Sequence, residues 1–400
     1  MKDVLFVAYG SGHVRMVLPV ALAMARAGLA RPRVLGLTTA APLVREAGLD
    51  LLQFKDFITA DDELALRHGK RLLQEMSVSV QDSEETIAYL GLCYAELEQD
   101  AGPDAARRQY QRDGRQAFLP LRTMQRILGA VKPSLVVATN SPRAERAAIH
   151  GAHMLGLPSV CLVDLFCLDE VGWIGQRDYA DRICVLNESV RQFLVRAGRD
   201  ATQVCVTGNP AFDALGDTTH VVEGASLRER NRWSGKKVVL WPTQVEPAFH
   251  PFNGKPGDVG LPQRALSKVI DWVRAREDCI LCIRPRAGEA VPHFPDDPRI
   301  KLMGQDIVLA SLLHAVDTVV TLNSTIGLEG HLAGKRLVQV LGSVFDDAMP
   351  LKQYGIADEA VEVELIPQAL DRCVDMPPAA ARPIQLDASA KVMDVLRGFL

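Results

Sequence analysis

The sequence has 400 residues, of which 48% are hydrophobic and 24% are charged, and its formal net charge is −4. This length exceeds what one hydrophobic core usually spans, so two domains are expected. The nearly balanced charge argues against the strongly basic surface of a nucleic-acid-binding protein, and no nucleic-acid partner is expected. An anionic ligand would therefore have to be bound by local hydrogen-bond donors.

The eight cysteines lie mostly inside apolar segments, as expected for buried free thiols in a reducing compartment. Cys279 and Cys282 have a C-x-x-C spacing, but no second pair completes a zinc site and they do not open a helix as a redox motif would. The sequence shows no signal peptide and no apolar run long enough to span a bilayer. We expect a cytoplasmic protein, and contact with the inner face of a membrane stays open.

Short apolar segments alternate with helix-forming segments through most of the chain. In the first half, strands are expected at 4–8, 32–37, 51–54, 135–138, 159–163, 182–186 and 203–206, with helices at 15–27, 41–47, 143–155 and 189–197. In the second half, strands are expected at 238–241, 279–284, 318–322 and 336–340, with helices at 263–274, 306–313, 324–333 and 389–400. The pattern predicts an α/β fold with two doubly wound, parallel-sheet, Rossmann-like domains that face each other across a cleft.

The predicted domains are residues 1–210 and 211–400, because Thr207–Pro210 interrupts regular structure. Residues 60–128 depart from the alternation and form a predicted helical insert, with helices at 61–76, 83–98, 104–111 and 114–128. Pro19 is expected in the first turn of its helix, which would place that helix start near Leu18. The terminal helix, with Ser389 as its predicted N-cap, is a candidate to pack back on the first domain.

Polar residues cluster directly after several expected strands. They are Gly10, Ser11, Gly12, His13, Asn140, Asp164, Thr243, Gln244, Arg284, Asn323, Ser324 and Thr325. In open parallel sheets, ligands bind at the carboxyl ends of the strands. The sequence therefore predicts one ligand-binding edge on each domain.

The segment 319–335 carries the strongest of these signals. An expected strand is followed, after a short polar turn, by a helix that starts at Ser324 or Thr325. Free backbone N–H groups and the helix dipole favour an anion there, and a capping hydroxyl can donate to a phosphate oxygen. Glu329 lies about one turn further on, where it could accept hydrogen bonds from the vicinal hydroxyls of a sugar. The alternative is an ordinary capped turn with a solvated Glu329.

In the first domain, Gly10 and Gly12 let a substrate approach the backbone, but the third glycine of a dinucleotide fingerprint is missing. His13 follows them, and an imidazole can accept a proton from a hydroxyl near neutral pH. His13 is thus a candidate general base, and the alternative is a histidine that caps the helix or binds substrate. Asn140 and Asp164 are candidate acceptor-binding or sugar-binding residues.

The second domain adds further candidates. Arg284 offers a fork of donors for phosphate, with a surface salt bridge as the alternative, while Thr243 and Gln244 could bind a base or phosphate or form a simple turn. The pair formed by Asp346 and Asp347 could bind sugar hydroxyls or be a solvated acidic turn. No D-x-D spacing occurs, which favours binding a diphosphate without a metal, so no cofactor is expected.

These features resemble the GT-B superfamily of nucleotide-sugar glycosyltransferases. The segment 10–13, with Pro19 after it, is similar to the G-H-x-x-P loop of family-1 and MurG-like enzymes. The segment 206–210 (V-T-G-N-P) is similar to UDP-N-acetylglucosamine 2-epimerases of the same fold, and 323–334 resembles the nucleotide-sugar helix of both groups. Asn323-Ser324-Thr325 stands where the glycine pair is usual, and Thr243–Glu246 stands in place of the epimerase histidine-arginine motif.

The resemblance implies diphosphate contacts at Ser324 and Thr325, a ribose contact at Glu329 and a catalytic base at His13, with Gly327 in the donor-binding helix. It implies a metal-independent glycosyltransferase that moves a sugar from a nucleotide-diphosphate sugar, here a UDP-sugar, to a glycan or lipid-linked acceptor. One alternative is a nucleotide-sugar 2-epimerase or hydrolase, with Asp164 and Glu188 as the candidate acid/base groups. Another is a non-catalytic binding member. The sequence carries no signal for the oligomeric state.

Overall fold

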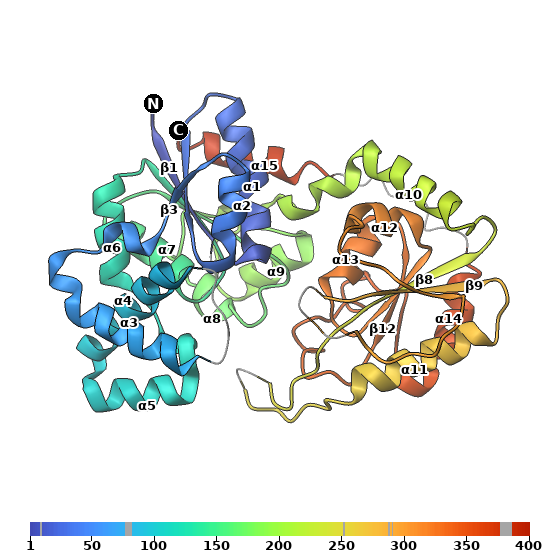
Figure 1. Ribbon diagram of the computed structural model, residues 1–400. Coiled ribbons are helices and arrows are strands. Elements are labelled where there is room, and N and C mark those ends of the chain that lie inside the picture. Colours follow the sequence, from blue (N-terminus) through green and yellow to red (C-terminus); the bar gives the residue numbers. More distant parts are fainter. Residues whose placement is uncertain (9, 77–81, 251–252, 287–288, 290, 377–385) are drawn as a thin grey trace. The chain divides into compact units, whose positions relative to one another are not determined.

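The computed structural model describes all residues except 9, 77–81, 251–252, 287–288, 290 and 377–385, and it divides into two compact units (Figure 1). Unit 1 comprises Met1–Ala211 together with Asp387–Leu400, and unit 2 comprises Phe212–Leu386. The last helix therefore belongs to unit 1. Among the described residues, no helix is both long enough and apolar enough to cross a membrane.

Unit 1 is built on a seven-stranded parallel sheet in the order β3-β2-β1-β4-β5-β6-β7. Its strands are β1 (Asp3–Ala8), β2 (Arg31–Gly36), β3 (Asp50–Leu52), β4 (Leu135–Thr139), β5 (Ser159–Leu162), β6 (Arg182–Val185) and β7 (Val204–Val206). Its helices are α1 (Ser11–Arg26), α2 (Ala41–Glu46), α3 (Glu63–Glu75), α4 (Ser83–Ala101), α5 (Pro103–Asp113), α6 (Leu121–Val131), α7 (Ala144–Met154), α8 (Val171–Ile174), α9 (Glu188–Arg196) and α15 (Ala388–Arg397). The central strands are almost entirely apolar because helices cover both faces of such a sheet.

The core of unit 1 forms where α1, α2 and α15 pack on one face of this sheet. Val17 and Val20 of α1 and Val392 of α15 are fully buried in one cluster with alternate residues of β1, such as Phe6. Helix α7 packs against β1, β4 and β5 and supports α6. Right-handed crossovers that run in opposite directions from the centre of the sheet place α1 and α7 on opposite faces.

The helical insert of unit 1 is held by a very close crossing of α3 and α4. A Cβ atom added to Gly69 would lie 2.0 Å from the carbonyl oxygen of Ile87, and one added to Gly91 would lie 2.1 Å from that of Ala65. The two helix backbones therefore touch at this point, and only glycine fits at either position. A chain of aromatic contacts runs from this crossing to the rest of the insert through Tyr89, Tyr94, Tyr110 and Phe118.

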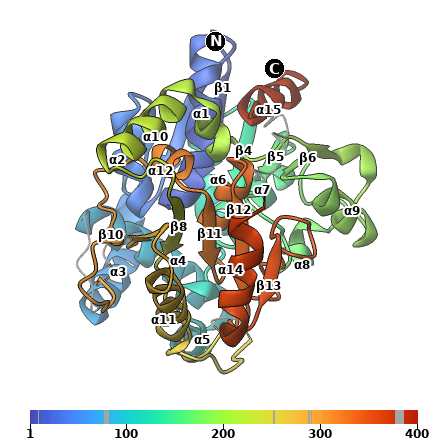
Figure 2. The same ribbon diagram turned by 90° about the vertical axis from the view of Figure 1, so that its right-hand side faces the viewer.

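Unit 2 is built on a six-stranded parallel sheet in the order β10-β9-β8-β11-β12-β13 (Figure 2). Its strands are β8 (Lys237–Pro242), β9 (Cys279–Arg284), β10 (Ile300–Leu302), β11 (Thr318–Thr321), β12 (Arg336–Val340) and β13 (Glu359–Val361). Its helices are α10 (Thr218–Arg230), α11 (Leu261–Arg274), α12 (Leu309–Ala315), α13 (Thr325–Leu332) and α14 (Ile366–Val374). The α/β class with two parallel sheets is thus confirmed.

The core of unit 2 lies under α11 and α14, whose apolar residues form one buried cluster with Val320 of β11 and Val338 of β12. Helix α13 packs on the neighbouring residue Val319, which faces the other way. A Cβ atom on Gly330 would lie 2.7 Å from Val319 Cγ2, and one on Gly327 would lie 2.8 Å from Thr321 Cγ2. These glycines let α13 approach the sheet closely.

The predicted start of the first helix near Leu18 is wrong, because α1 begins at Ser11 and encloses Pro19. Gly10 is the N-cap, and its carbonyl accepts the first helical hydrogen bond from the Val14 N–H at 2.9 Å. Pro19 removes only the bond to the carbonyl of the exposed Arg15, while burial of the opposite face of α1 stabilises the helix. Ser11, Gly12 and His13 therefore lie in a helical turn.

Other boundaries also differ from the sequence-based expectations. Ser389 is not an N-cap, because α15 starts one residue earlier and follows Asp387. The helix expected from Asp306 starts only at Leu309. Among the α-helices and strands of the described residues, five were not predicted: α8, α10, α14, β10 and β13. The two strands have three residues each, too few for a recognisable pattern. All eight cysteines are unpaired, and all except the half-exposed Cys205 are buried, in agreement with the prediction of free thiols.

Candidate functional site

Both sheets reverse their strand order at a topological switch point, and the predicted polar clusters lie there. In unit 1 the order reverses between β1 and β4, which are followed by the segment 10–13 and by Asn140. In unit 2 it reverses between β8 and β11, which are followed by 243–244 and by 323–325. Ligands of open α/β sheets bind in the crevice at such points. Each unit therefore has one edge suited to a ligand.

At the unit 2 edge, α13 begins with Ser324 as its N-cap, and the Ser324 hydroxyl oxygen accepts the Ile326 N–H at 3.2 Å. The hydroxyl hydrogen remains a donor, and Thr325 beside it is exposed. Gly327 is buried against Thr321 and Leu337, so its place is in the helix–sheet contact. Glu329 is half-buried further along the same helix. The free donors at this edge are therefore concentrated on Ser324 and Thr325.

Gln244 and Asn323 are bonded to each other and support the turn that leads to α13. The Gln244 Oε1 atom accepts the Thr321 hydroxyl and the Leu322 N–H, both at 2.8 Å. Its Nε2 atom donates to Asn323 Oδ1 at 2.7 Å. Two residues that the sequence nominated as ligands thus hold the backbone of the turn in place.

The side chains of Thr243 and Arg284 are also engaged within unit 2. The Thr243 hydroxyl donates to Glu289 at 2.7 Å and accepts the Arg286 N–H at 2.9 Å. Arg284 is 7% exposed, and its guanidinium donates to the Gly304 carbonyl and to Gln305. Burial lowers the pKa of Arg284. The more accessible cation at this strand end is Arg286, whose side chain is 77% exposed.

Two acidic residues at the end of β12 have different surroundings. The Asp346 Oδ2 atom accepts the Gly342 N–H at 2.7 Å, and its buried Oδ1 atom has no hydrogen-bond partner among the described residues. Burial is the main cause that raises the pKa of Asp346 to about 6, and the charge of Glu246 adds to it. The Asp347 side chain is 93% exposed, and its Oδ2 atom lies 3.7 Å from Lys255 Nζ. The structure therefore separates this pair into one half-buried and one exposed carboxylate.

At the unit 1 edge, His13 lies in the first turn of α1, directly after the switch point. Its Nδ1 atom is shielded from water and has no hydrogen-bond partner among the described residues. Gly12 next to it has open space where a side chain would stand. A half-buried imidazole beside an open backbone can accept a proton from a bound hydroxyl.

A group of carboxylates lies beside the same edge, and sequence reasoning found only part of it. Asn140 is 1% exposed and donates through Nδ2 to Asp164 at 2.9 Å and to Glu170 at 3.2 Å. Burial, followed by the charge of Asp164, raises the pKa of Glu170 to about 7. Glu188, the second carboxylate proposed from sequence, is instead exposed and paired with Arg191. Glu170 was missed because it follows a loop and no strand.

The Glu170 carboxyl predicts a pH dependence of stability. Its pKa is about 7 in the folded chain against an ordinary 4.5, so the folded state binds the proton more tightly between these pH values. The contribution of Glu170 to the free energy of unfolding therefore falls as pH rises from 4.5 to 7, by on the order of 3 kcal/mol. We expect Glu170→Gln to resemble the unsubstituted protein at pH 4.5 and to be more stable at pH 8, in urea unfolding.

The control is Asp169→Asn, which removes the neighbouring exposed charge. Because this charge is a smaller cause of the raised pKa of Glu170 than burial and the charge of Asp164, most of the pH dependence should remain. Equal pH dependence of Glu170→Gln and the unsubstituted protein would contradict the assignment of the raised pKa to Glu170.

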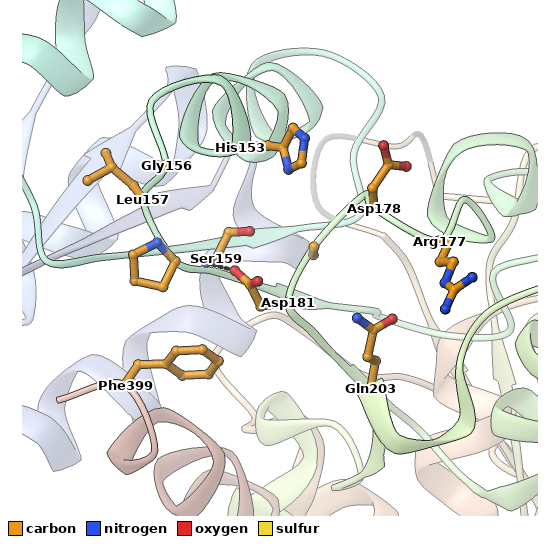
Figure 3. A pocket seen from close by; sticks show the side chains of 11 residues that line it. His153, Gly156, Leu157, Ser159, Arg177, Asp178, Asp181, Gln203 and Phe399 are labelled. Carbon is orange, nitrogen blue, oxygen red and sulfur yellow. Dashed lines mark hydrogen bonds between the residues drawn. The ribbon is translucent and has the colours of Figure 1, made fainter.

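A separate pocket of about 640 Å³ lies in unit 1, away from these strand ends (Figure 3). Ser159 begins β5, while Asp181 and Gln203 directly precede β6 and β7, so the pocket lies at the amino ends of these strands. None of the predicted site residues lines it. Among the described residues, no group of three His, Cys, Asp or Glu side chains is placed to bind a metal ion.

A family model described as "Capsule polysaccharide biosynthesis protein" matches residues 280–357, which run from β9 past β12 and include the α13 turn. A search of curated protein sequences found no match. Solved structures, in contrast, match over almost the whole chain, as described next.

The S. aureus MnaA–UDP co-structure matches this chain with 12% sequence identity and a TM-score of 0.64. The match covers 100% of this chain and 97% of the MnaA chain. The UDP-GlcNAc 2-epimerase from Neisseria meningitidis bound to UDP-GlcNAc is 12% identical, with coverage of 99% and 100% and a TM-score of 0.57. CalG4, the calicheamicin glycosyltransferase, is 18% identical, with coverage of 100% and 98% and a TM-score of 0.58. With its two parallel-sheet units, the chain has the GT-B fold.

Proposed function

We propose that this chain is a glycosyltransferase that moves a sugar from a nucleotide-diphosphate sugar, a UDP-sugar, to an acceptor hydroxyl. The observation that carries the proposal is the group of hydrogen-bond donors in the turn before α13, at the switch point of the unit 2 sheet. Ser324 and Thr325 offer hydroxyl and N–H donors at a helix N-terminus, which suits a diphosphate. The printed names of the similar structures, which include UDP, UDP-GlcNAc and a glycosyltransferase, support this choice.

In the proposed reaction, unit 2 binds the donor and unit 1 provides the base. The bond between the anomeric carbon and the phosphate oxygen breaks as the acceptor oxygen attacks, and negative charge develops on the departing diphosphate. The hydrogen-bond donors at the start of α13 stabilise this charge without a metal ion, because donors fixed at a helix N-terminus need little rearrangement as the charge develops. His13 takes the proton of the acceptor hydroxyl.

The acceptor is proposed to be a glycan or a lipid-linked saccharide. The support is the match of residues 280–357 to the capsule polysaccharide model, because this segment contains the proposed diphosphate site. A cytoplasmic enzyme at the inner face of a membrane would meet such acceptors, and this location is part of the proposal.

A second candidate is a nucleotide-sugar 2-epimerase or hydrolase. It is favoured by the carboxylates of Asp164 and Glu170 on either side of Asn140, since such reactions need acid and base groups beside the sugar. The pKa of Glu170 near 7 lets it exchange a proton at neutral pH. Product formed from the donor alone identifies this activity, and product that requires an acceptor identifies the transferase. A chain that binds a nucleotide but turns over no donor with any acceptor is a binding protein.

Binding of UDP tests the common part of both candidates. At about one hundred times its dissociation constant, UDP should raise the free energy of unfolding by about 2.7 kcal/mol, seen as a higher midpoint in thermal unfolding. Ser324→Ala should reduce this shift and should cost about 1 kcal/mol of N-cap stability. Ser189→Ala removes an exposed hydroxyl from the first turn of α9 and should keep the shift. If neither UDP nor any nucleotide sugar raises the midpoint, the proposed function is wrong.

A further inference from the structure

A chain of hydrogen-bonded side chains lies behind the α13 turn and joins the ends of three strands. Its members, in order, are Thr321, Gln244, Asn323, Ser343 and Glu246. Asn323 Nδ2 donates to Ser343 Oγ at 2.6 Å, and Ser343 Oγ donates to Glu246 Oε2 at 2.7 Å. Glu246 is 2% exposed and Ser343 is 3% exposed, so this end of the chain is closed to water.

Backbone N–H groups at both ends allow these side chains only one orientation. At one end, the Leu322 N–H donates to Gln244 at 2.8 Å, so Gln244 must present its oxygen there. Its amide nitrogen then faces Asn323, whose own nitrogen must face Ser343. The Ser343 hydroxyl hydrogen is left to donate to Glu246. Neither amide can flip, because a backbone N–H cannot become an acceptor.

Glu246 is the one acceptor on which all these bonds end. Its Oε2 atom accepts from Ser343, and its Oε1 atom accepts the Val344 N–H at 2.7 Å. A carboxylate can accept at both oxygens, whereas an amide would set an N–H against one of the two donors. The buried charge is tolerated because both oxygens are hydrogen-bonded.

The hydrogen-bonded chain of side chains also determines which hydrogen-bond donors the 323–325 turn can offer a ligand. The Ser324 N–H donates to the Thr321 hydroxyl at 3.2 Å, which links the N-cap directly to the chain. The Ile326 N–H is occupied by the Ser324 hydroxyl oxygen. The Ser324 hydroxyl hydrogen and the donors of the exposed Thr325 remain available. This end of the turn presents donors, which match the oxygens of a diphosphate.

We propose that Glu246 is a positioning residue for the donor diphosphate, and that it holds the 323–325 turn in its binding geometry through Ser343 and Asn323. The inference rests on the proposed function, because it names what fixes the geometry of that same site. Glu246 acts through the chain and does not itself touch the ligand.

The test is Glu246→Gln in the full-length protein, with two measurements. Hydrogen exchange of the peptide covering residues 321–327 is measured without ligand, and UDP binding is measured by calorimetry. We expect faster exchange in this peptide and at least about tenfold weaker UDP binding, because a hydrogen bond to a charged group is replaced by opposed donors. Unchanged exchange overturns the inference, and so does unchanged UDP affinity.

The matched control is Glu96→Gln. Glu96 is 5% exposed and likewise accepts a hydroxyl and backbone N–H groups, from Thr123 and Arg122, but it lies in the helical insert of unit 1. The same chemical change there should cost stability and leave both the exchange of 321–327 and the UDP affinity unchanged. An equal loss of UDP affinity in this variant overturns the assignment to Glu246.

If Glu246→Gln does not fold, Ser343→Ala provides the second variant. It interrupts the hydrogen-bonded chain of side chains at Ser343 but keeps the hydrogen bond from the Val344 N–H to Glu246. It should give the same two changes at smaller size, and unchanged values overturn the inference. If the unsubstituted protein binds neither UDP nor UDP-GlcNAc, the proposed function fails. The exchange comparison needs no ligand and decides separately whether Glu246 fixes the turn.

Discussion

Replacing Gly69 with alanine is expected to lower the free energy of unfolding of unit 1 by about 3 kcal/mol or more. The added methyl group would lie 2.0 Å from the Ile87 carbonyl oxygen and 2.8 Å from its carbon. These are backbone atoms of α4, so no side-chain rotation can relieve the overlap and the two helices must separate. Urea unfolding followed by circular dichroism measures the effect.

The control for this prediction is the same substitution in a neighbouring helix. Gly129 of α6 is exposed and has no atom within 4 Å of an added Cβ. Gly129→Ala should therefore stabilise the protein by roughly 0.5 to 1 kcal/mol, through helix propensity alone. The two changes are chemically identical and their predicted effects have opposite signs. A small or stabilising effect of Gly69→Ala would show that α3 and α4 do not cross this closely.

Replacing His13 with alanine is expected to lower the rate of sugar transfer by about 10² to 10⁴-fold, the usual range for loss of a general base. The imidazole stands in the first turn of α1, directly after the switch point of the unit 1 sheet, where ligands of open α/β sheets bind. UDP affinity should stay within about twofold, because the diphosphate donors belong to unit 2. Turnover with a UDP-sugar and an acceptor panel measures the first effect, and calorimetry the second.

His153→Ala serves as the control, since His153 is exposed at the amino-end pocket of unit 1 and should leave turnover unchanged. His13→Asn keeps a hydrogen-bonding side chain and removes the base, so it separates binding from proton transfer. A rate of His13→Ala equal to that of the unsubstituted protein would remove His13 from the mechanism. The proton would then have to go to another group at this edge, such as Glu170.

Much of the fold could be predicted because buried parallel strands are mostly apolar. Strands such as β4 and β9 stand out from any polar surroundings. The parts that were missed depend on tertiary contacts. Helix α10 carries exposed valines and a scattered polar pattern, and α12 holds it at Gly224, where an added Cβ would meet His314 at 2.6 Å. The sequence of α10 itself contains no pattern that predicts this contact.

The site was predictable at the level of strand ends and not at the level of individual roles. The predicted polar clusters lie at the switch points because a polar turn follows each apolar strand that ends there. Sequence cannot show which polar residues also bond their neighbours, as Gln244 and Arg284 do in the structure. Glu246 and Ser343 escaped notice because their importance comes from a contact across 97 positions of the chain.

Helix α15 covers α1 and completes the core of unit 1, although all of unit 2 precedes it in the chain. In the sequence, unit 2 is therefore inserted between the two segments of unit 1. During synthesis, the apolar side of α1 that receives Val392 stays uncovered until residues 387–400 have been made. Unit 1 therefore cannot complete its core until after all of unit 2 has been synthesised. Its slow step should be the arrival of its own final helix, since contacts so distant along the chain form late.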